Sequence, residues 1–389
     1  MEISINNNFR TLYNTSTPIH NNYFIGNRIA FANDLRCDKF EKSENTMTAP
    51  VFAGKKTNRK ESKKIEETLK NIDGLHDPYS DVIMISQKKF RHLQGKIQKR
   101  SSAESMNNLM NGYTEHMFPS ETEVFNLLRH AVHDAKKNGT ANGLTYTDIL
   151  QENLPIAKAR LINNQFNVTD NIRDYAQKNL TKDEQKCVGR YLEIINNDIC
   201  NDQFRIKKSI EMLRGLYNDI PDKAAVDHII KLSHNFPNTA TSADAFIVKY
   251  ADKTQEEIAE LLVSPSQISI EHIKPSSERG ESKGANYLAA SKRMNNYRSS
   301  TPLDEMIERY PNIPKQTQRY MDELISKINR GGLSDIALTL PDVRESLYNE
   351  SKGLIDVNIS KLNPQITEKV EHHKSKLQEL VEHFKQKED

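Results

Sequence analysis

The sequence predicts a mainly α-helical protein in which one small β-loop-β-α unit is embedded between two helical regions. Three observations favour this fold. Apolar residues recur at helical spacing from Pro119 to Leu262 and again beyond Ser300, and S/T-x-x-E capping boxes mark several helix starts. Residues 268–300 interrupt that rhythm with a short alternating run and a polar loop. At 389 residues, the chain is long enough for two or three domains.

Composition indicates a polar protein without a membrane-spanning segment. Hydrophobic residues make up 36% and charged residues 28%, and no apolar run approaches the roughly 20 residues that a transmembrane helix needs. The first residues lack the basic and apolar regions of a secretory signal. The three cysteines, Cys37, Cys187 and Cys200, show no CxxC spacing. We therefore expect a cytoplasmic protein with neither a disulfide framework nor a membrane partner.

The first 118 residues show little periodic structure. Residues 1–70 are rich in Asn, Thr, Ser and Lys and include the charge run KKTNRKESKK at 55–64, so we expect them to be largely disordered. Residues 71–118 are interpreted as a linker of uncertain structure. Within them, the apolar run DVIMIS at 81–86 is compatible with one strand but is too short for periodicity to separate strand from helix.

Residues 119–254 are expected to form an α-helical domain. Capping boxes pair Ser120 with Glu123 and Thr181 with Glu184, and a third, of Thr254 with Glu257, opens the next segment. Gly139 is predicted to end the first helix. We interpret the apolar stripes that follow these starts as core packing. They comprise Val124, Leu127, Leu128, Ala131 and Val132, then Val188, Tyr191, Leu192 and Ile195, and then Val226, Ile229 and Ile230.

Residues 311–389 are assigned to C-terminal helices. Past Ser300, one apolar stripe contains Leu303, Met306 and Ile307, and a second contains Tyr320, Leu324, Ile325 and Ile328 and ends near Gly331 and Gly332. We expect these two helices to follow the β-loop-β-α unit directly. The segment from about 366 to 387 is highly charged with one apolar face, which suits a peripheral helix or one that mediates self-association.

Residues 255–310 contain the β-loop-β-α unit. Alternation at Ile268 and Ile270 predicts a first strand, and a polar, glycine-containing loop covers 276–284. A second short apolar stretch, 287–290, leads into a polar run of helical character.

The polar residues of this unit resemble the HNH endonuclease family. That family carries an acidic residue and a His in the first strand, an Asn at the start of the second and an Asn or His on the following helix. Glu271-His272 matches the first element, Asn286 the second and Asn295 the third. The steps of 14 residues from His272 to Asn286 and 9 from Asn286 to Asn295 are familiar in the family. The resemblance is confined to residues 268–307.

The resemblance implies a ββα-metal fold and a metal-dependent nuclease with the catalytic set His272, Asn286 and Asn295. His272 would be the general base, and Asn286 would hold the loop and orient the imidazole. Glu271 and Asn295 would give oxygen ligands to one divalent cation, Mg²⁺ in the first place and Mn²⁺ as the alternative. A neutral imidazole is a suitable base at neutral pH. Adjacent strand residues point to opposite faces, so Glu271 and His272 reach one ion only if the strand ends or bends there.

Local charge, the absence of a CxxC pair and the asparagine beside Asn295 complete the site prediction. The whole chain is balanced, with 55 basic and 53 acidic residues, but 268–300 holds six basic residues against three acidic ones. No CxxC pair stands at 289–294, so we expect no structural zinc. Asn296 adjoins Asn295 and could be the ligand in its place. The residues expected to contact nucleic acid are Lys274, Arg279, Lys292, Arg293 and Arg298.

Three functions follow from these observations. The first is a metal-dependent endonuclease that acts on DNA rather than RNA. The second is a catalytically inactive HNH-fold module that binds nucleic acid. The third is a helical protein-interaction adaptor or effector in which the HNH-like loop is incidental. Metal-dependent cutting separates the first from the second, and salt-dependent nucleic-acid binding separates both from the third.

Overall fold

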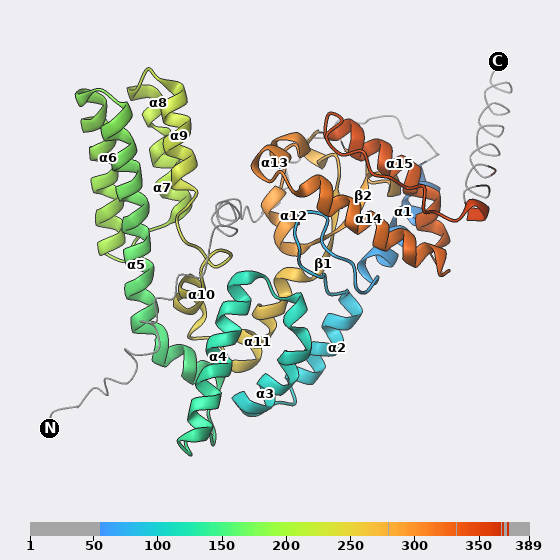
Figure 1. Ribbon diagram of the computed structural model, residues 1–389, viewed down its shortest axis with the longest axis horizontal. Helices are drawn as coiled ribbons and strands as arrows, with labels where there is room; N and C mark the ends of the chain where they lie inside the picture. Colours follow the sequence, from blue (N-terminus) through green and yellow to red (C-terminus); the bar gives the residue numbers. More distant parts are fainter. Residues whose placement is uncertain (1–54, 279, 332, 367, 369–371, 373–389) are drawn as a thin grey trace.

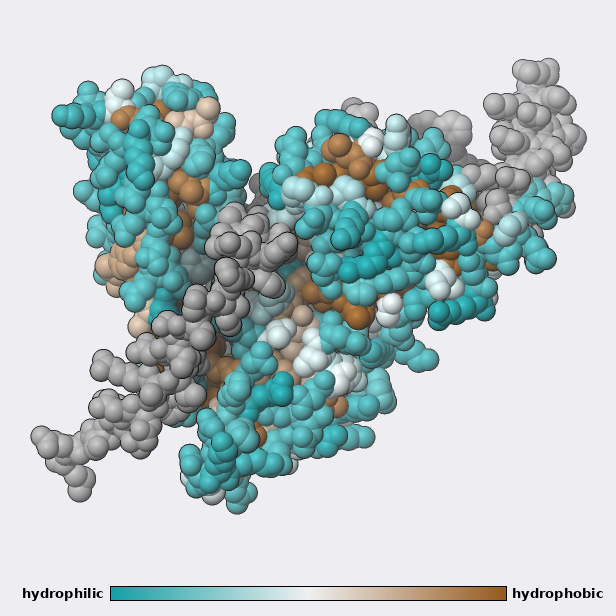
Figure 2. Space-filling view, in the orientation of Figure 1, coloured by the Kyte–Doolittle hydropathy of each residue, from teal (hydrophilic) through white to brown (hydrophobic). Residues whose placement is uncertain are grey.

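The computed structural model describes residues 55–278, 280–331 and 333–366, together with 368 and 372. These residues are mainly α-helical and contain one sheet of two strands, so the predicted fold class is confirmed at that level. Figure 2 shows a largely hydrophilic surface on the face that it draws. No helix in the described ranges combines the length and the apolar character that crossing a membrane would demand.

Three hydrophobic cores organise the described chain (Figure 1). The ββα core contains α1 (Lys55–Lys70), β1 (Ile268–His272), β2 (Tyr287–Ser291), α12 (Lys292–Arg298), α13 (Leu303–Arg309), α14 (Ile313–Asn329) and α15 (Ser334–Glu350). The central core contains α2 (Gln87–Ile97), α3 (Ala103–Met110), α4 (Pro119–Lys137), the first part of α5 (Tyr146–Asn179), α10 (Ala243–Tyr250) and α11 (Gln255–Val263). The arm core contains the rest of α5 with α6 (Lys182–Cys200), α7 (Ile206–Arg214), α8 (Leu216–Asp219) and α9 (Lys223–Ser233).

These cores divide the chain differently from the predicted domains. The expected single helical domain at 119–254 is split between the central and arm cores, with α5 belonging to both. Residues 71–118 are not a linker, because α2 and α3 pack in the central core. The run 81–86 forms two isolated bridges rather than a strand, His76 with Ile83 and Ile85 with Gln267. The second bridge places this run beside the start of β1.

Helix α1 replaces the disorder that was expected over residues 55–70, while residues 1–54 lie outside the described part of the chain. Ile65 and Leu69 stand one helical turn apart and are 3% and 2% exposed. The helix contacts both strands and the short helix η5 (Gly284–Asn286). The helix is otherwise polar, and these two apolar side chains are buried by contact with the β1–β2 hairpin. Sequence periodicity alone therefore missed this helix.

Two of the three predicted capping boxes are confirmed. Thr181 and Thr254 each cap a helix, and each is bonded reciprocally to the Glu three residues later. The box at Ser120 is wrong because α4 begins at Pro119, and Phe118 rather than Ser120 is its N-cap. Proline at the first helical position is favoured since it needs no amide partner there. Ser120 therefore lies inside the helix, and its hydroxyl donates to Glu121 at 2.9 Å instead.

The predicted ends of α4 and α14 are confirmed by backbone geometry. Gly139 and Gly331 follow these helices with φ of +71° and +99°, the left-handed region that glycine adopts without strain. The two helices expected past Ser300 are α13 and α14. Helix α15 lies within the span assigned to C-terminal helices, although no apolar stripe was identified for it. The charged segment expected at 366–387 lies almost wholly outside the described residues.

Gly284 lies where η5 passes between α1 and α15, and its substitution tests this packing. A Cβ at this position would stand 2.6 Å from Ile65 Cδ1 and 2.9 Å from Thr339 Cγ2. We expect Gly284→Ala to lower the free energy of unfolding in urea by about 1–3 kcal/mol through overpacking. Gly189→Ala is the matched control: α6 leaves open space there, so alanine should raise stability by about 0.5–1 kcal/mol. Unchanged stability of Gly284→Ala would contradict this account.

Candidate functional site

The two strands and α12 form the predicted β-loop-β-α order. β1 and β2 pair antiparallel in a regular register from Ile268 with Ser291 to His272 with Tyr287. Ser291 ends β2 and is also the N-cap of α12, since its hydroxyl accepts a hydrogen bond from the amide of Met294. The helix therefore starts without a connecting loop and packs back against β1.

Asn295 ties α12 to the outer edge of β1. Its Nδ2 donates to the Ile270 carbonyl and to the Ser269 hydroxyl, both at 2.9 Å. These bonds satisfy an edge carbonyl that no neighbouring strand covers within the described residues. Asn295 thus fixes the angle between the helix and the strand that carries His272.

Asn286 closes the loop between the strands. Its Oδ1 accepts a hydrogen bond from the Lys274 amide at 2.8 Å, and its Nδ2 donates to the carbonyls of Lys274 and Glu281, both at 3.0 Å. Its own carbonyl accepts from the Ile273 amide at 3.0 Å. Asn286 thereby fixes the backbone directly after His272, which is the loop-holding part of the role expected for it.

Glu271 forms a buried ion pair with Arg298. The two side chains are 2% and 0% exposed, and Arg298 also donates to the carbonyls of His272 at 2.6 Å and Ile273 at 2.5 Å. The second carboxylate oxygen, Oε2, has no hydrogen-bond partner among the described residues. Burial raises the pKa of Glu271 to about 7, and the guanidinium opposes that rise. The guanidinium of Arg298 therefore donates hydrogen bonds to the Glu271 carboxylate and to the carbonyls of His272 and Ile273.

Glu271 and His272 lie on opposite faces of β1. The strand keeps its regular pairing through His272, so the bend that would bring both side chains to one ion does not occur. Glu271 faces α12 and Arg298, whereas His272 faces α1. The described residues hold no group of three or more His, Cys, Asp or Glu side chains placed to bind a metal ion. In this arrangement Glu271 and Asn295 do not fit the expected cation site.

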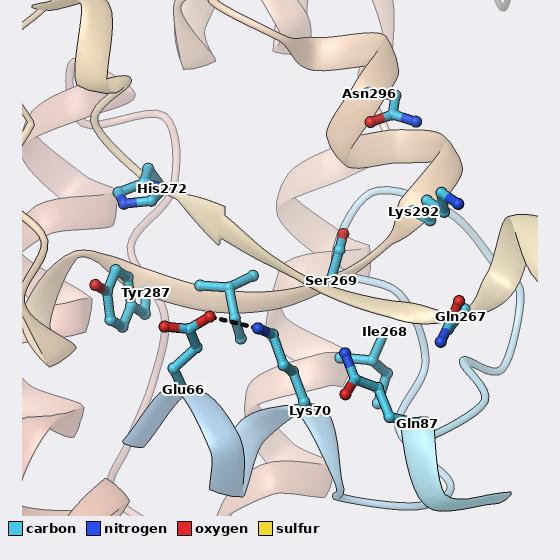
Figure 3. A pocket seen from close by; sticks show the side chains of 11 residues that line it. Glu66, Lys70, Gln87, Gln267, Ile268, Ser269, His272, Tyr287, Lys292 and Asn296 are labelled. Carbon is cyan, nitrogen blue, oxygen red and sulfur yellow. Dashed lines mark hydrogen bonds and ion pairs between the residues drawn. The ribbon is translucent and has the colours of Figure 1, made fainter. Parts of the chain in front are cut away.

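His272 lines a cavity of about 410 Å³ that runs along β1 between α1 and α12 (Figure 3). Glu66 and Lys70 of α1 form one wall and bond to each other. Figure 3 shows Glu66 and Tyr287 near the His272 end and Lys292 and Asn296 on α12 across the cavity. The wall residues with polar side chains are Glu66, Lys70, Gln87, Gln267, Ser269, His272, Tyr287, Lys292 and Asn296.

The imidazole of His272 is held but not fully bonded. Its ring packs edge-to-face on Tyr287, with the centroids 5.1 Å apart. Its Nε2 is enclosed and has no hydrogen-bond partner within the described residues. Burial lowers the pKa of His272, while the Glu66 carboxylate acts in the opposite direction, so the neutral form of the ring is favoured over that of a free imidazole. A buried polar atom without a partner is uncommon and is a recurrent mark of catalytic or ligand-binding sites.

The structure separates the residues expected to contact nucleic acid. Lys292 is exposed on the wall of the cavity. Arg293 is 11% exposed, pairs with Glu121 and lies over the Phe118 ring. Arg298 is fully buried, so its guanidinium cannot reach a phosphate from this position. Lys274 lies 3.6 Å from Glu350, and Arg279 is outside the described residues. Lys292 alone among the four described is both exposed and without an ion pair.

Sequence reasoning missed the α1 wall of the cavity. Glu66 and Lys70 fall in the segment that was expected to be disordered. A signal was present, because Ile65 and Leu69 are spaced one turn apart and Glu66 and Lys70 have the i,i+4 spacing of a helical ion pair. Ser269 was passed over because a single strand serine carries no chemical signature.

Comparison of the chain with protein-family models, with curated proteins and with solved structures found no match. The HNH resemblance therefore rests on Glu271, His272, Asn286 and Asn295 as they stand in the sequence.

Proposed function

We propose that this protein is an HNH-type nuclease that hydrolyses phosphodiester bonds in nucleic acid, DNA rather than RNA, at a site centred on His272. One observation carries the proposal: an imidazole whose pKa is lowered by burial lies on the wall of a cavity that also presents Lys70 and Lys292. A base and cations that can pair with phosphate oxygens are the groups that this reaction needs.

Three wall residues and two asparagines have roles in this proposal. The imidazole of His272 accepts a proton from the attacking water, which its lowered pKa allows at neutral pH. The ammonium groups of Lys70 and Lys292 bind the phosphate oxygens. Asn295 and Asn286 are positioning residues, because they fix α12 and the loop around His272 through backbone bonds.

A divalent cation in such a site would stabilise charge on the phosphate oxygens. The expected ligand Glu271 is paired with Arg298 instead, so experiment must decide whether the reaction requires a cation. The same ion pair favours a second candidate function, an HNH-fold module that binds nucleic acid without cutting it. In that case the ββα unit keeps its fold through Glu271 and Arg298 and has lost its metal ligand.

Incubation of the purified full chain with supercoiled plasmid tests the proposal. We expect nicked plasmid to accumulate, and comparison of Mg²⁺, Mn²⁺ and EDTA shows whether the reaction requires a cation. Nicking that persists in EDTA would support the hydrolase activity and show that it does not require a divalent cation. Plasmid, single-stranded DNA and RNA that all stay intact but bind would support the second candidate. Intact substrates without any salt-dependent binding would leave the protein-interaction adaptor.

A further inference from the structure

A second, larger cavity opens beside the His272 cavity. It has a volume of about 740 Å³ and lies between the arm, α10 and α12. In Figure 1 the arm, α5–α9, stands beside the part of the molecule that contains α12 and α13. We refer to this cavity as the arm cleft. Lys292 and Asn296 line both the arm cleft and the His272 cavity, so the two cavities adjoin at the exposed face of α12.

The walls of the arm cleft are basic. Of the six lysines and arginines that line it, Arg214 pairs with Glu211 and Arg293 pairs with Glu121. The remaining four have exposed side chains and form no ion pair with any described residue; they are Arg205, Lys207, Lys249 and Lys292. Four unpaired cations around one cavity attract a polyanion, and they come from three separate parts of the fold.

The arm cleft also has aromatic walls. Phe204, Tyr250 and Tyr297 line it and are each half-buried. Phe204 packs on Phe236 and Tyr250 on Phe246, with centroids 4.9 Å apart in each case. Lys249 Nζ lies 5.1 Å from the centroid of the Tyr250 ring, so a cation and a ring face share one spot. These rings are held in place and present apolar surface beside the charges.

We propose that the arm cleft binds single-stranded nucleic acid and leads it over Lys292 and Asn296 to His272; this inference rests on the proposed function. Basic grooves lined with aromatic rings bind single strands, since phosphates pair with the cations and unpaired bases stack on the rings. A duplex encloses its base faces and would leave Phe204, Tyr250 and Tyr297 uncovered. The cavity volume also suits a few nucleotides rather than a double helix.

Binding measured by fluorescence anisotropy tests the inference. The probe is a labelled single strand of about 12 nucleotides, compared with its duplex. The protein is the full chain carrying His272→Ala, in EDTA, so that the probe stays intact. We expect the single strand to bind more tightly than the duplex. Lys207→Glu with Lys249→Glu should raise the Kd for the single strand about tenfold or more and should lower the salt slope by about 1.4, for two lost phosphate contacts.

The matched control reverses two exposed lysines outside both cavities, Lys99→Glu with Lys182→Glu, and has the same net charge as the cleft variant. Its Kd should stay within about twofold of the parent, because the two lysines lie outside both cavities. Since the control and the cleft variant have the same net charge, a difference in Kd between them reflects the position of the changed charges. A third variant, Tyr250→Leu, should weaken single-strand binding about tenfold and leave the salt slope unchanged, because it removes stacking and keeps the cations.

Two results would overturn the inference: a duplex that binds as tightly as the single strand, or a cleft variant that binds like the control variant. Thermal melts of each variant show whether the fold is intact. The inference and the proposed function fail separately. If the wild-type protein never cuts and the cleft variant loses binding, the proposed nuclease activity is rejected and the nucleic-acid-binding role of the arm cleft is supported. If the wild-type protein cuts and the cleft variant binds normally, the nuclease activity is supported and the role of the arm cleft is rejected.

Discussion

His272→Ala is expected to lower the rate of plasmid nicking by about 10²–10⁴-fold, the range that removal of a general base costs. The reason is positional: among the described residues, His272 is the histidine that lines the cavity beside β1. The measurement is the initial rate of supercoiled plasmid loss at pH 7.5 in Mg²⁺. His272→Asn provides a second test, since an amide keeps hydrogen-bonding groups in the cavity and cannot act as a base.

The matched control is His130→Ala, which removes an exposed histidine of α4 away from the cavity and should nick at the wild-type rate. The pH profile adds an independent check. Because burial lowers the pKa of His272, the midpoint of the pH-rate profile should lie below pH 6.5, and the nicking rate should rise through that midpoint to a plateau at higher pH. Wild-type rates in both His272 variants would exclude this residue as the base and would leave Lys70 or Glu66 to be tested.

Arg298→Met is expected to lower the free energy of unfolding by about 3–5 kcal/mol, the usual cost of breaking a buried ion pair from one side. Methionine fills part of the space, but it leaves Glu271 buried without its partner and removes the donors to the carbonyls of His272 and Ile273. Urea unfolding at pH 7.5 measures the change. The effect is large because both side chains are enclosed, at 0% and 2% exposure.

Two further variants show whether the pair itself is responsible. Arg309→Met breaks an exposed i,i+4 pair with Glu305 in α13 and should cost less than about 0.5 kcal/mol. The double variant Glu271→Met with Arg298→Met removes both charges, so it should be more stable than Arg298→Met alone. An Arg298→Met protein as stable as wild type would show that Glu271 is satisfied by another group, which would reopen its assignment as a metal ligand.

Local chemistry explains which parts of the fold could be predicted. The capping boxes at Thr181 and Thr254 and the glycine stop at Gly139 depend on residues within one turn of each other, so the sequence contains the whole interaction. The β-loop-β-α order is also local, because turn residues and alternation set it within a short stretch. The capping box predicted at Ser120 was wrong for a local reason too, since Pro119 is the first residue of the helix.

The parts that could not be predicted depend on contacts between distant segments. Glu271 reads as a metal ligand beside His272, and only the packing of α12 on β1 shows that Arg298 neutralises it. Lys207, Lys249 and Lys292 line the arm cleft from three different helices, and their spacing in the sequence does not predict that they lie around one cavity. Helix α1 enters the site from residues more than 200 positions away, so no local pattern could place Glu66 near His272.

The continuity of α5 has a mechanical consequence. The helix belongs to the central core through Ile149 and to the arm core through Ile172, and Pro155 lies inside it, where one backbone hydrogen bond is missing. From Pro155 to Asn179 the helix extends about 36 Å at 1.5 Å per residue, so a rotation of about 5° at the proline swings its far end by about 3 Å. A change in helix direction at Pro155 would therefore be magnified toward the tip of the arm.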